Sequence, residues 1–235
     1  TIQVQNDCRV QIQTLANSYS VFVPVDYTFD TATAVLTGSE GWRLMSSPVQ
    51  TTYTTFLSPV WTQGATAASS TAGTPNVYNW NKSVSGRDVN DWLPVTDLNT
   101  SIPQGEGFLM YVYNQDDFGS TPSAGFPKFL PARGTPHTPD ISPVLNTNAD
   151  GWTLLGNPFA TTIDWSRITK SDVQNSVYVW DANDATGVQE DPDQGNTGSW
   201  KVNASGVGEF DGMIRPFQGF FVQTSGASPS VTFTE

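Results

Sequence analysis

The chain has 235 residues, a net charge of −12 and only one cysteine, Cys8, which excludes an intramolecular disulfide. Its ten basic residues are scattered, which argues against a nucleic-acid or anionic-membrane partner, because neutralising phosphates takes clustered Lys and Arg. Charged residues make up only 14% of the chain, and Thr, Ser, Asn, Gln and Gly carry the polarity instead. This composition is common in extracellular proteins, so we expect an extracellular or cell-surface location.

The first 40 residues are predicted to form strands of their own. Residues 1–5 alternate apolar and polar side chains, with Ile2 and Val4 apolar, as a half-buried strand does. Residues 9–13 and 20–29 alternate in the same way. Pro24 lacks an amide donor, so we expect the third of these strands to lie at a sheet edge or to contain a bulge.

A stretch near the start of the next segment occurs twice. GWRLMSSP at residues 41–48 returns as GWTLLGNP at residues 151–158. The eight tryptophans fall into four ordered pairs with separations of about 100–110 residues. These pairs are Trp42 with Trp152, Trp61 with Trp165, Trp80 with Trp180, and Trp92 with Trp200. We therefore predict two homologous units, at residues 41–113 and 151–235, joined by a connector at residues 114–150.

Short strands separated by turn residues are predicted throughout both units. In the first unit they are residues 42–45, 77–80, 92–95 and 108–113, with a helical turn or a strand at 56–61. In the second they are residues 152–155, 163–165, 177–180, 199–202 and 217–222, followed by a final strand at 230–234. The connector holds too many prolines for a regular element, with a strand at residues 141–145 as the one alternative left open. The predicted fold class is all-β, an internally duplicated antiparallel β-sandwich-like body with extra terminal strands.

The duplicated tryptophans are expected to fill the hydrophobic layer that each unit must bury. The alternative is that they are stacking platforms for sugars. An exposed indole would then be expected near the insertions beside Trp61, Trp80 and Trp180.

The sequence GWTLLGNPFATTIDW at residues 151–165 resembles a pattern that recurs in secreted and surface proteins of Bacteroidota, many of them similar to type IX secretion cargo. The first unit departs from it, with Ser46 and Ser47 in place of Gly-Asn. The resemblance implies export and an all-β body, and it implies no catalytic mechanism. Asp30-Thr31-Ala32 also resembles the short O-glycosylation site of these bacteria, which makes Thr31 a candidate acceptor.

An acidic insertion between the last two tryptophans is a candidate Ca²⁺ site, because hard oxygen ligands closely spaced in a turn can hold this ion. The alternative is a solvated loop without metal. Its carboxylates are those of Asp181, Asp184, Glu190, Asp191 and Asp193. No other cofactor is expected.

Catalysis finds little support in the sequence. The lone histidine, His137, lies in the proline-rich connector with no second histidine or cysteine to partner it. Glu106 and Glu209 precede equivalent strands, but no sequence feature pairs them as a glycosidase requires. We therefore expect no catalytic residues and no enzymatic activity.

The function that we expect is that of a secreted structural protein, a subunit of an extracellular filament or surface assembly joined by β-strand addition. The terminal strands at residues 1–5 and 230–234 are the predicted assembly strands, through Ile2, Val4, Val231 and Phe233. Self-association is then the main partnership. The rival hypothesis is a carbohydrate-binding or adhesive module with glycans as partners.

Overall fold

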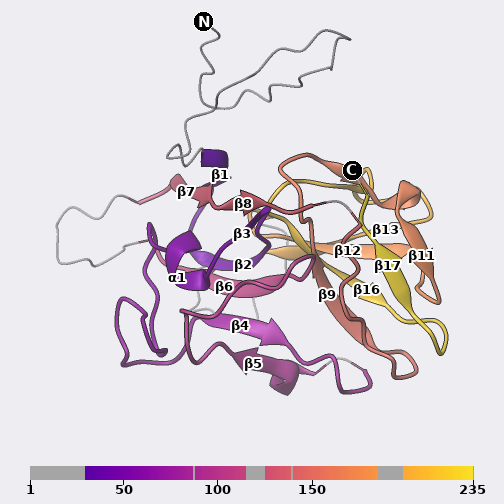
Figure 1. Ribbon diagram of the computed structural model, residues 1–235, viewed down its shortest axis with the longest axis horizontal. Coiled ribbons are helices and arrows are strands. Elements are labelled where there is room, and N and C mark those ends of the chain that lie inside the picture. Colours follow the sequence, from indigo (N-terminus) through magenta and orange to yellow (C-terminus); the bar gives the residue numbers. More distant parts are fainter. Residues whose placement is uncertain (1–29, 87, 115–124, 139, 185–197, 235) are drawn as a thin grey trace, which may run out of the picture.

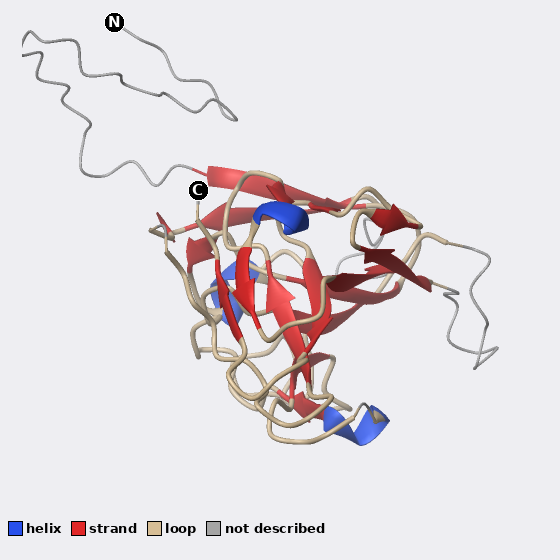
Figure 2. Cartoon of the chain, turned by 90° about the vertical axis from the view of Figure 1, so that its right-hand side faces the viewer, coloured by secondary structure: helices blue, strands red, loops and turns tan. Residues whose placement is uncertain are grey.

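Strands make up almost all of the regular structure, which confirms the all-β fold class. The computed structural model describes residues 30–86, 88–114, 125–138, 140–184 and 198–234. The helical segments are α1 (Tyr53–Phe56) and two 3₁₀ turns, η1 (Val89–Asp91) and η2 (Trp165–Arg167). Figure 2 shows how small these helical pieces are beside the strands. All of these helices are too short to cross a membrane.

The first repeat unit forms a four-stranded antiparallel sheet. Its strands are β2 (Gly41–Met45), β4 (Val77–Trp80), β5 (Trp92–Pro94) and β6 (Phe108–Val112), in the order β2-β6-β4-β5. The strand β6 is apolar throughout and lies between β2 and β4, as its sequence predicted. The helix α1 begins after Thr52, whose side chain accepts a hydrogen bond from the Thr55 backbone N–H and caps the first turn.

The second repeat unit forms a five-stranded antiparallel sheet. Its strands are β9 (Trp152–Gly156), β12 (Ser176–Asp181), β13 (Ser199–Ala204), β14 (Val207–Gly208) and β16 (Gly219–Gln223). Their order is β14-β13-β12-β16-β9.

The two sheets repeat each other in topology and in register. With the short β14 set aside, β9, β16, β12 and β13 take the places of β2, β6, β4 and β5. The pairing of Leu44 with Leu109 returns as Leu154 with Phe221. The cross-strand tryptophan pair Trp80–Trp92 likewise returns as Trp180–Trp200. The predicted duplication is therefore visible in the strand pairing itself.

Four two-stranded ribbons accompany the two sheets in the described part of the chain. They are β1 (Asp30–Leu36) with β7 (Lys128–Arg133), β3 (Val49–Gln50) with β8 (Thr135–Pro136), β10 (Ile163–Asp164) with β15 (Met213–Ile214), and β11 (Thr169–Ser171) with β17 (Ser230–Thr232). The first two ribbons adjoin the first sheet and β11–β17 adjoins the second (Figure 1). Ile163 and Ile214 of the β10–β15 ribbon pack in the apolar cluster of the second sheet.

The prediction that the prolines of the connector exclude a regular element is wrong, and at residues 141–145, where a strand was left open, the structure has only an isolated bridge from Ile141 to Phe233. Six residues of the connector form β7, with Pro131 opposite Thr33 of β1. A proline is tolerated here because β7 belongs to a two-stranded ribbon and has one edge that needs no donor. The strand β1 itself was not predicted, and the strands predicted at residues 1–5, 9–13 and 20–29 lie outside the described residues.

Apolar side chains gather in three layers. One lies on the outer face of the first sheet, beneath α1 and the β1–β7 ribbon, and a second lies on the outer face of the second sheet. The third lies between the two sheets and contains equivalent residues from both units. Its members are Leu44, Trp80, Trp152, Leu154 and Phe221, with Trp92, Leu109, Tyr178 and Trp180 packed against them.

The two units are joined by a reciprocal exchange of backbone contacts. Met45 bridges Gln218, and its equivalent, Leu155, bridges Glu106. The hydrogen bonds beside these bridges repeat in the same way, because the Ser46 N–H donates to the Phe217 carbonyl over 2.9 Å and the Gly156 N–H donates to the Gly105 carbonyl over 2.9 Å. The halves are thus related by a pseudo-twofold axis and meet at the centre of the molecule (Figure 1).

The tryptophans are less uniformly buried than the sequence suggested. Trp80, Trp152 and Trp165 are buried, whereas Trp42, Trp61, Trp92 and Trp180 are partly buried and Trp200 is exposed. The most exposed of them, Trp200, had not been singled out. Trp200 follows the acidic insertion along the chain. The insertion therefore indicates the right region for an exposed indole, although the expectation named Trp180, which precedes it.

Candidate functional site

The candidate site is a groove along the edge of β1. Among the described residues, β1 pairs only with β7, so its other edge has no strand partner. Five consecutive residues of β1, Ala32 to Leu36, line a groove of about 770 Å³. Successive side chains of a strand point to opposite faces, so five in a row can border one groove only where it runs along the strand edge.

A second strand edge forms the opposite wall. Arg43, Leu44 and Met45 of β2 line it, together with residues 216–218 that precede β16. The strand β2 is the outermost strand of its sheet, and beyond β6 the described contact along its backbone is the single bridge from Met45 to Gln218. The groove therefore lies between the edge of β1 and the edge of β2. Among the described residues, these two strands do not pair with each other.

The edge of β1 lacks the usual protection against pairing. Ala32 to Leu36 contain no charged residue and no proline, which are the devices that natural proteins use to block an exposed edge. The adjacent strand β7, by contrast, carries Lys128, Pro131 and Arg133. Val35 of β1 and Phe129 of β7 lie opposite each other, both line the groove, and they are 53% and 55% exposed.

Arg43 fixes the turn that leads from β1 into β2. Its guanidinium is buried and donates to the backbone carbonyls of Thr37 and Ser39 over 3.3 and 2.6 Å, and to the carbonyl of Trp42 over 3.0 Å. Burial lowers the Arg43 pKa to about 10, with the nearby carboxylate of Asp181 opposing the change. The side chain stays protonated at neutral pH and holds the two walls of the groove in a fixed relation.

The predicted assembly strands have different outcomes. Ile2 and Val4 lie outside the described residues. Val231 and Phe233 are fully buried in the layer on the outer face of the second sheet. Val231 pairs with Lys170 of β11, and Phe233 bridges Ile141. The C-terminal strand thus completes its own chain, contrary to the expectation that it is available to a neighbour.

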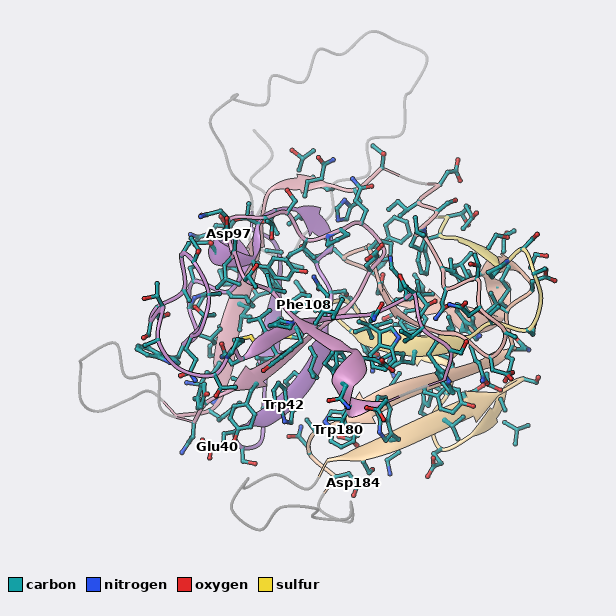
Figure 3. The ribbon with its side chains drawn as sticks, turned by 90° about the horizontal axis from the view of Figure 1, so that it is seen from below. Glu40, Trp42, Asp97, Phe108, Trp180 and Asp184 are labelled. Atoms are coloured by element: carbon teal, nitrogen blue, oxygen red, sulfur yellow. The ribbon has the colours of Figure 1, made fainter. Side chains whose placement is uncertain are left out.

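The predicted Ca²⁺ site is only partly within the described chain. Asp181 accepts a hydrogen bond from the Asn183 N–H, and Asp184 accepts from Ser199 and pairs with Lys201. Glu190, Asp191 and Asp193 lie outside the described residues. Within the described ranges, no three His, Cys, Asp or Glu side chains converge. Ca²⁺ binding stays a prediction. Figure 3 shows Asp184 at the periphery of the molecule.

Thr31, the candidate glycosylation site, falls in β1, and its side chain lies outside the described part. The two carboxylates considered for catalysis have separate structural partners. Glu106 forms a 2.6 Å ion pair with Lys82, and Glu209 accepts a hydrogen bond from the Val202 N–H over 3.2 Å. Each carboxylate is therefore held in place by its own neighbour.

His137 is a buried, neutral side chain that makes stability depend on pH. It is buried, and its Nδ1 atom has no hydrogen-bond partner among the described residues. Burial lowers its pKa, and a hydrogen bond with the Ser47 backbone opposes this. A base whose pKa is lowered by folding takes up its proton at a higher pH in the unfolded chain than in the folded one. Its contribution to stability is therefore present above its ordinary pKa, and it is lost as the pH falls toward the pKa of the folded state.

We therefore expect the free energy of unfolding to fall as the pH is lowered from about 7.5 to about 5.5, a window around the ordinary His pKa. His137 is the only histidine, so a His137→Gln variant should have a flatter profile in this window. Urea denaturation of both proteins at several pH values measures this. Parallel profiles for the two proteins would show that His137 is not the group responsible.

Comparison with known proteins gives a family without an assigned activity. A family model described as a domain of unknown function (DUF8693) matches residues 4–235, which is nearly the whole chain. No curated protein and no solved structure matches the chain.

Proposed function

The chain belongs to the family described as a domain of unknown function (DUF8693), and we propose that this member is a non-catalytic structural subunit that assembles by β-strand addition along β1. The assembly is an extracellular filament or surface layer. The location is supported by the low content of charged residues and by the resemblance of residues 151–165 to secreted proteins.

The observation that carries the proposal is the uncharged edge of β1 beside an open groove. A strand added there gains main-chain hydrogen bonds from β1 and places alternate side chains against apolar walls. The segment from Ala32 to Leu36 offers about 17 Å of edge at the usual rise per residue. This is enough for a five-residue strand such as residues 1–5.

The donor that we propose is the N-terminal segment of a second copy. Residues 1–5 have the alternating pattern that strand addition requires, with Ile2 and Val4 on one face. The C-terminal strand is a poor donor, because withdrawing it would expose Val231 and Phe233, both of which are buried. The proposal therefore retains only one of the two terminal strands considered from the sequence.

Deleting residues 1–5 is expected to abolish assembly and to leave a folded monomer, because the donor strand is lost while the repeat units are intact. Size-exclusion chromatography with light scattering, together with negative-stain microscopy, measures this. Polymers of normal length after the deletion would contradict the donor role of this segment.

A charge placed on the acceptor strand tests the other side of the contact. Val35→Lys is expected to prevent assembly without unfolding the chain, because Val35 is exposed and lysine on an edge strand opposes pairing. The matched control is Val144→Lys, an exposed valine that does not line the groove. Equal assembly of the two variants would exclude β1 as the acceptor.

A further inference from the structure

The ring of Phe221, from the second repeat unit, fills part of the layer between the two sheets. Phe221 is 2% exposed, and its ring lies edge to face against four indoles. The ring centroids are 4.9 Å from Trp80, 5.8 Å from Trp92, 6.3 Å from Trp152 and 5.8 Å from Trp200. Such edge-to-face contacts add to the stabilisation that burial alone provides.

The equivalent position in the first half is Leu109. The pseudo-twofold axis exchanges Trp80 with Trp180, Trp92 with Trp200, and Trp152 with Trp42. A ring at position 109 would therefore face four indoles, and these same four line a pocket of about 380 Å³ around Leu109. Its lining residues are Trp42, Leu44, Tyr78, Val89, Trp92, Leu109, Trp180 and Trp200. Figure 3 shows Trp42 and Trp180 near the junction of the two halves.

The pocket thus corresponds to the site of the Phe221 ring, with leucine where the other half has phenylalanine. A second departure from symmetry accompanies it. The Trp80 Nε1–H donates to the Trp152 carbonyl over 2.9 Å, whereas the equivalent carbonyl of Trp42 accepts from Arg43. The buried Trp180 Nε1 has no hydrogen-bond partner among the described residues. Within the described ranges, Trp180 thus lacks the hydrogen bond across the interface that anchors Trp80.

We propose that this pocket is a binding site for a small uncharged molecule that carries an aromatic ring, with the ring in the position that Phe221 occupies in the other half. The guest gains the edge-to-face contacts that Leu109 cannot make. Trp200, 39% exposed, and Val89, 79% exposed, line the pocket and leave it open to solvent. A guest larger than a phenyl ring can extend past them.

The lining favours an aromatic guest over a sugar. None of the eight lining residues carries a charge, a carboxamide or a carboxylate, and the Tyr78 hydroxyl already donates to the Pro75 carbonyl over 2.6 Å. A saccharide hydroxyl buried here would lose its hydrogen bonds to water with few acceptors to replace them, which disfavours its binding. This pocket shares Leu44 with the groove beside β1, its other lining residues are different, and it does not depend on strand assembly.

Titration with 4-fluorophenol, followed by fluorine NMR and by indole fluorescence, tests the proposal. The wild-type chain is expected to bind the probe saturably. Leu109→Phe supplies the missing ring from within the chain, so it should weaken binding at least about tenfold while the melting temperature stays the same or rises. Absence of saturable binding to the wild type, or equal binding to Leu109→Phe, would overturn the proposal.

Exchanging the two residues provides the matched control. In the double variant Leu109→Phe with Phe221→Leu, the total side-chain volume is unchanged and the vacancy moves to the other half. Binding of 4-fluorophenol is expected to return, now perturbing the signals of Trp80 and Trp152. A folded double variant that binds nothing would contradict the ring-site assignment. Cellobiose is the second probe. If cellobiose binds saturably, 4-fluorophenol does not, and Leu109→Phe weakens the binding of cellobiose, the ligand class is a glycan and the proposal of an aromatic ligand is overturned.

Discussion

Replacing Phe221 with alanine is expected to lower the free energy of unfolding by about 3–5 kcal/mol, the range found for large aromatic side chains removed from a core. The ring is almost fully buried and lies against indoles of both repeat units. Its removal leaves a cavity in the layer that holds the two sheets together. Urea or thermal denaturation of the variant measures the change.

Leu109→Ala is the matched control for this prediction, because it removes the equivalent side chain from the first unit. Leu109 is only partly buried and already borders a pocket, so its loss should cost less than about 2 kcal/mol. Similar costs for the two variants would show that the layer between the sheets does not depend on the Phe221 ring.

Gly156→Ala is expected to destabilise the chain by about 2–3 kcal/mol through overpacking at the pseudo-twofold axis. Gly156 is the equivalent of Ser46, and the two residues meet where the halves cross. A Cβ atom at Gly156 would lie 2.3 Å from the Ser46 Cβ and 2.6 Å from the Glu106 carbonyl oxygen. Two equivalent side chains cannot share this point, so one of the two residues must lack a side chain.

Ser46→Gly in the same chain should recover part of that loss, because it removes the nearer of the two clashes. Alone, Ser46→Gly should cost about 1 kcal/mol, since its hydroxyl donates to the Asn157 carbonyl over 3.0 Å. A double-mutant cycle from urea denaturation is expected to give a coupling energy of about 1 kcal/mol or more. Strict additivity of the two changes would show that these residues do not meet at the axis.

The repeat units could be predicted from sequence because their strands carry strong local signals. Val77 to Trp80 was predicted as a strand and forms β4 with the same bounds, and the apolar run after Gly107 forms the central strand β6. Each run is bounded by turn residues, and the ordered tryptophans set its place in the duplicated unit. Apolar runs and turn residues depend only on neighbours along the chain, so they can be recognised without knowledge of the fold.

The candidate site was not predictable in the same way. The strand β1 is recognised as an edge only once its partner β7 is known, and Pro131 in β7 argued against a strand there. One signal was present in the sequence, since residues 32–36 carry no charge. The pocket at Leu109 could not be predicted from the sequence either. A leucine in place of phenylalanine indicates a pocket only when the four indoles around it are known.

Both proposals concern places where the duplication is broken. Arg43 stands where the second unit has Thr153, and it holds the turn between β1 and β2 that borders the groove. Leu109 stands where the second unit has Phe221, and a pocket results. At both positions the departure from the repeat lies beside a groove or a pocket.

Nuclear Overhauser contacts of the Phe221 ring test most directly the claim that the two halves share one indole-filled layer. The ring belongs to the second unit, and we predict contacts from its protons to the indole protons of Trp80 and Trp92 in the first unit, whose ring centroids lie at 4.9 and 5.8 Å. Contacts confined to Trp152 and Trp200 of its own unit would contradict the shared interior.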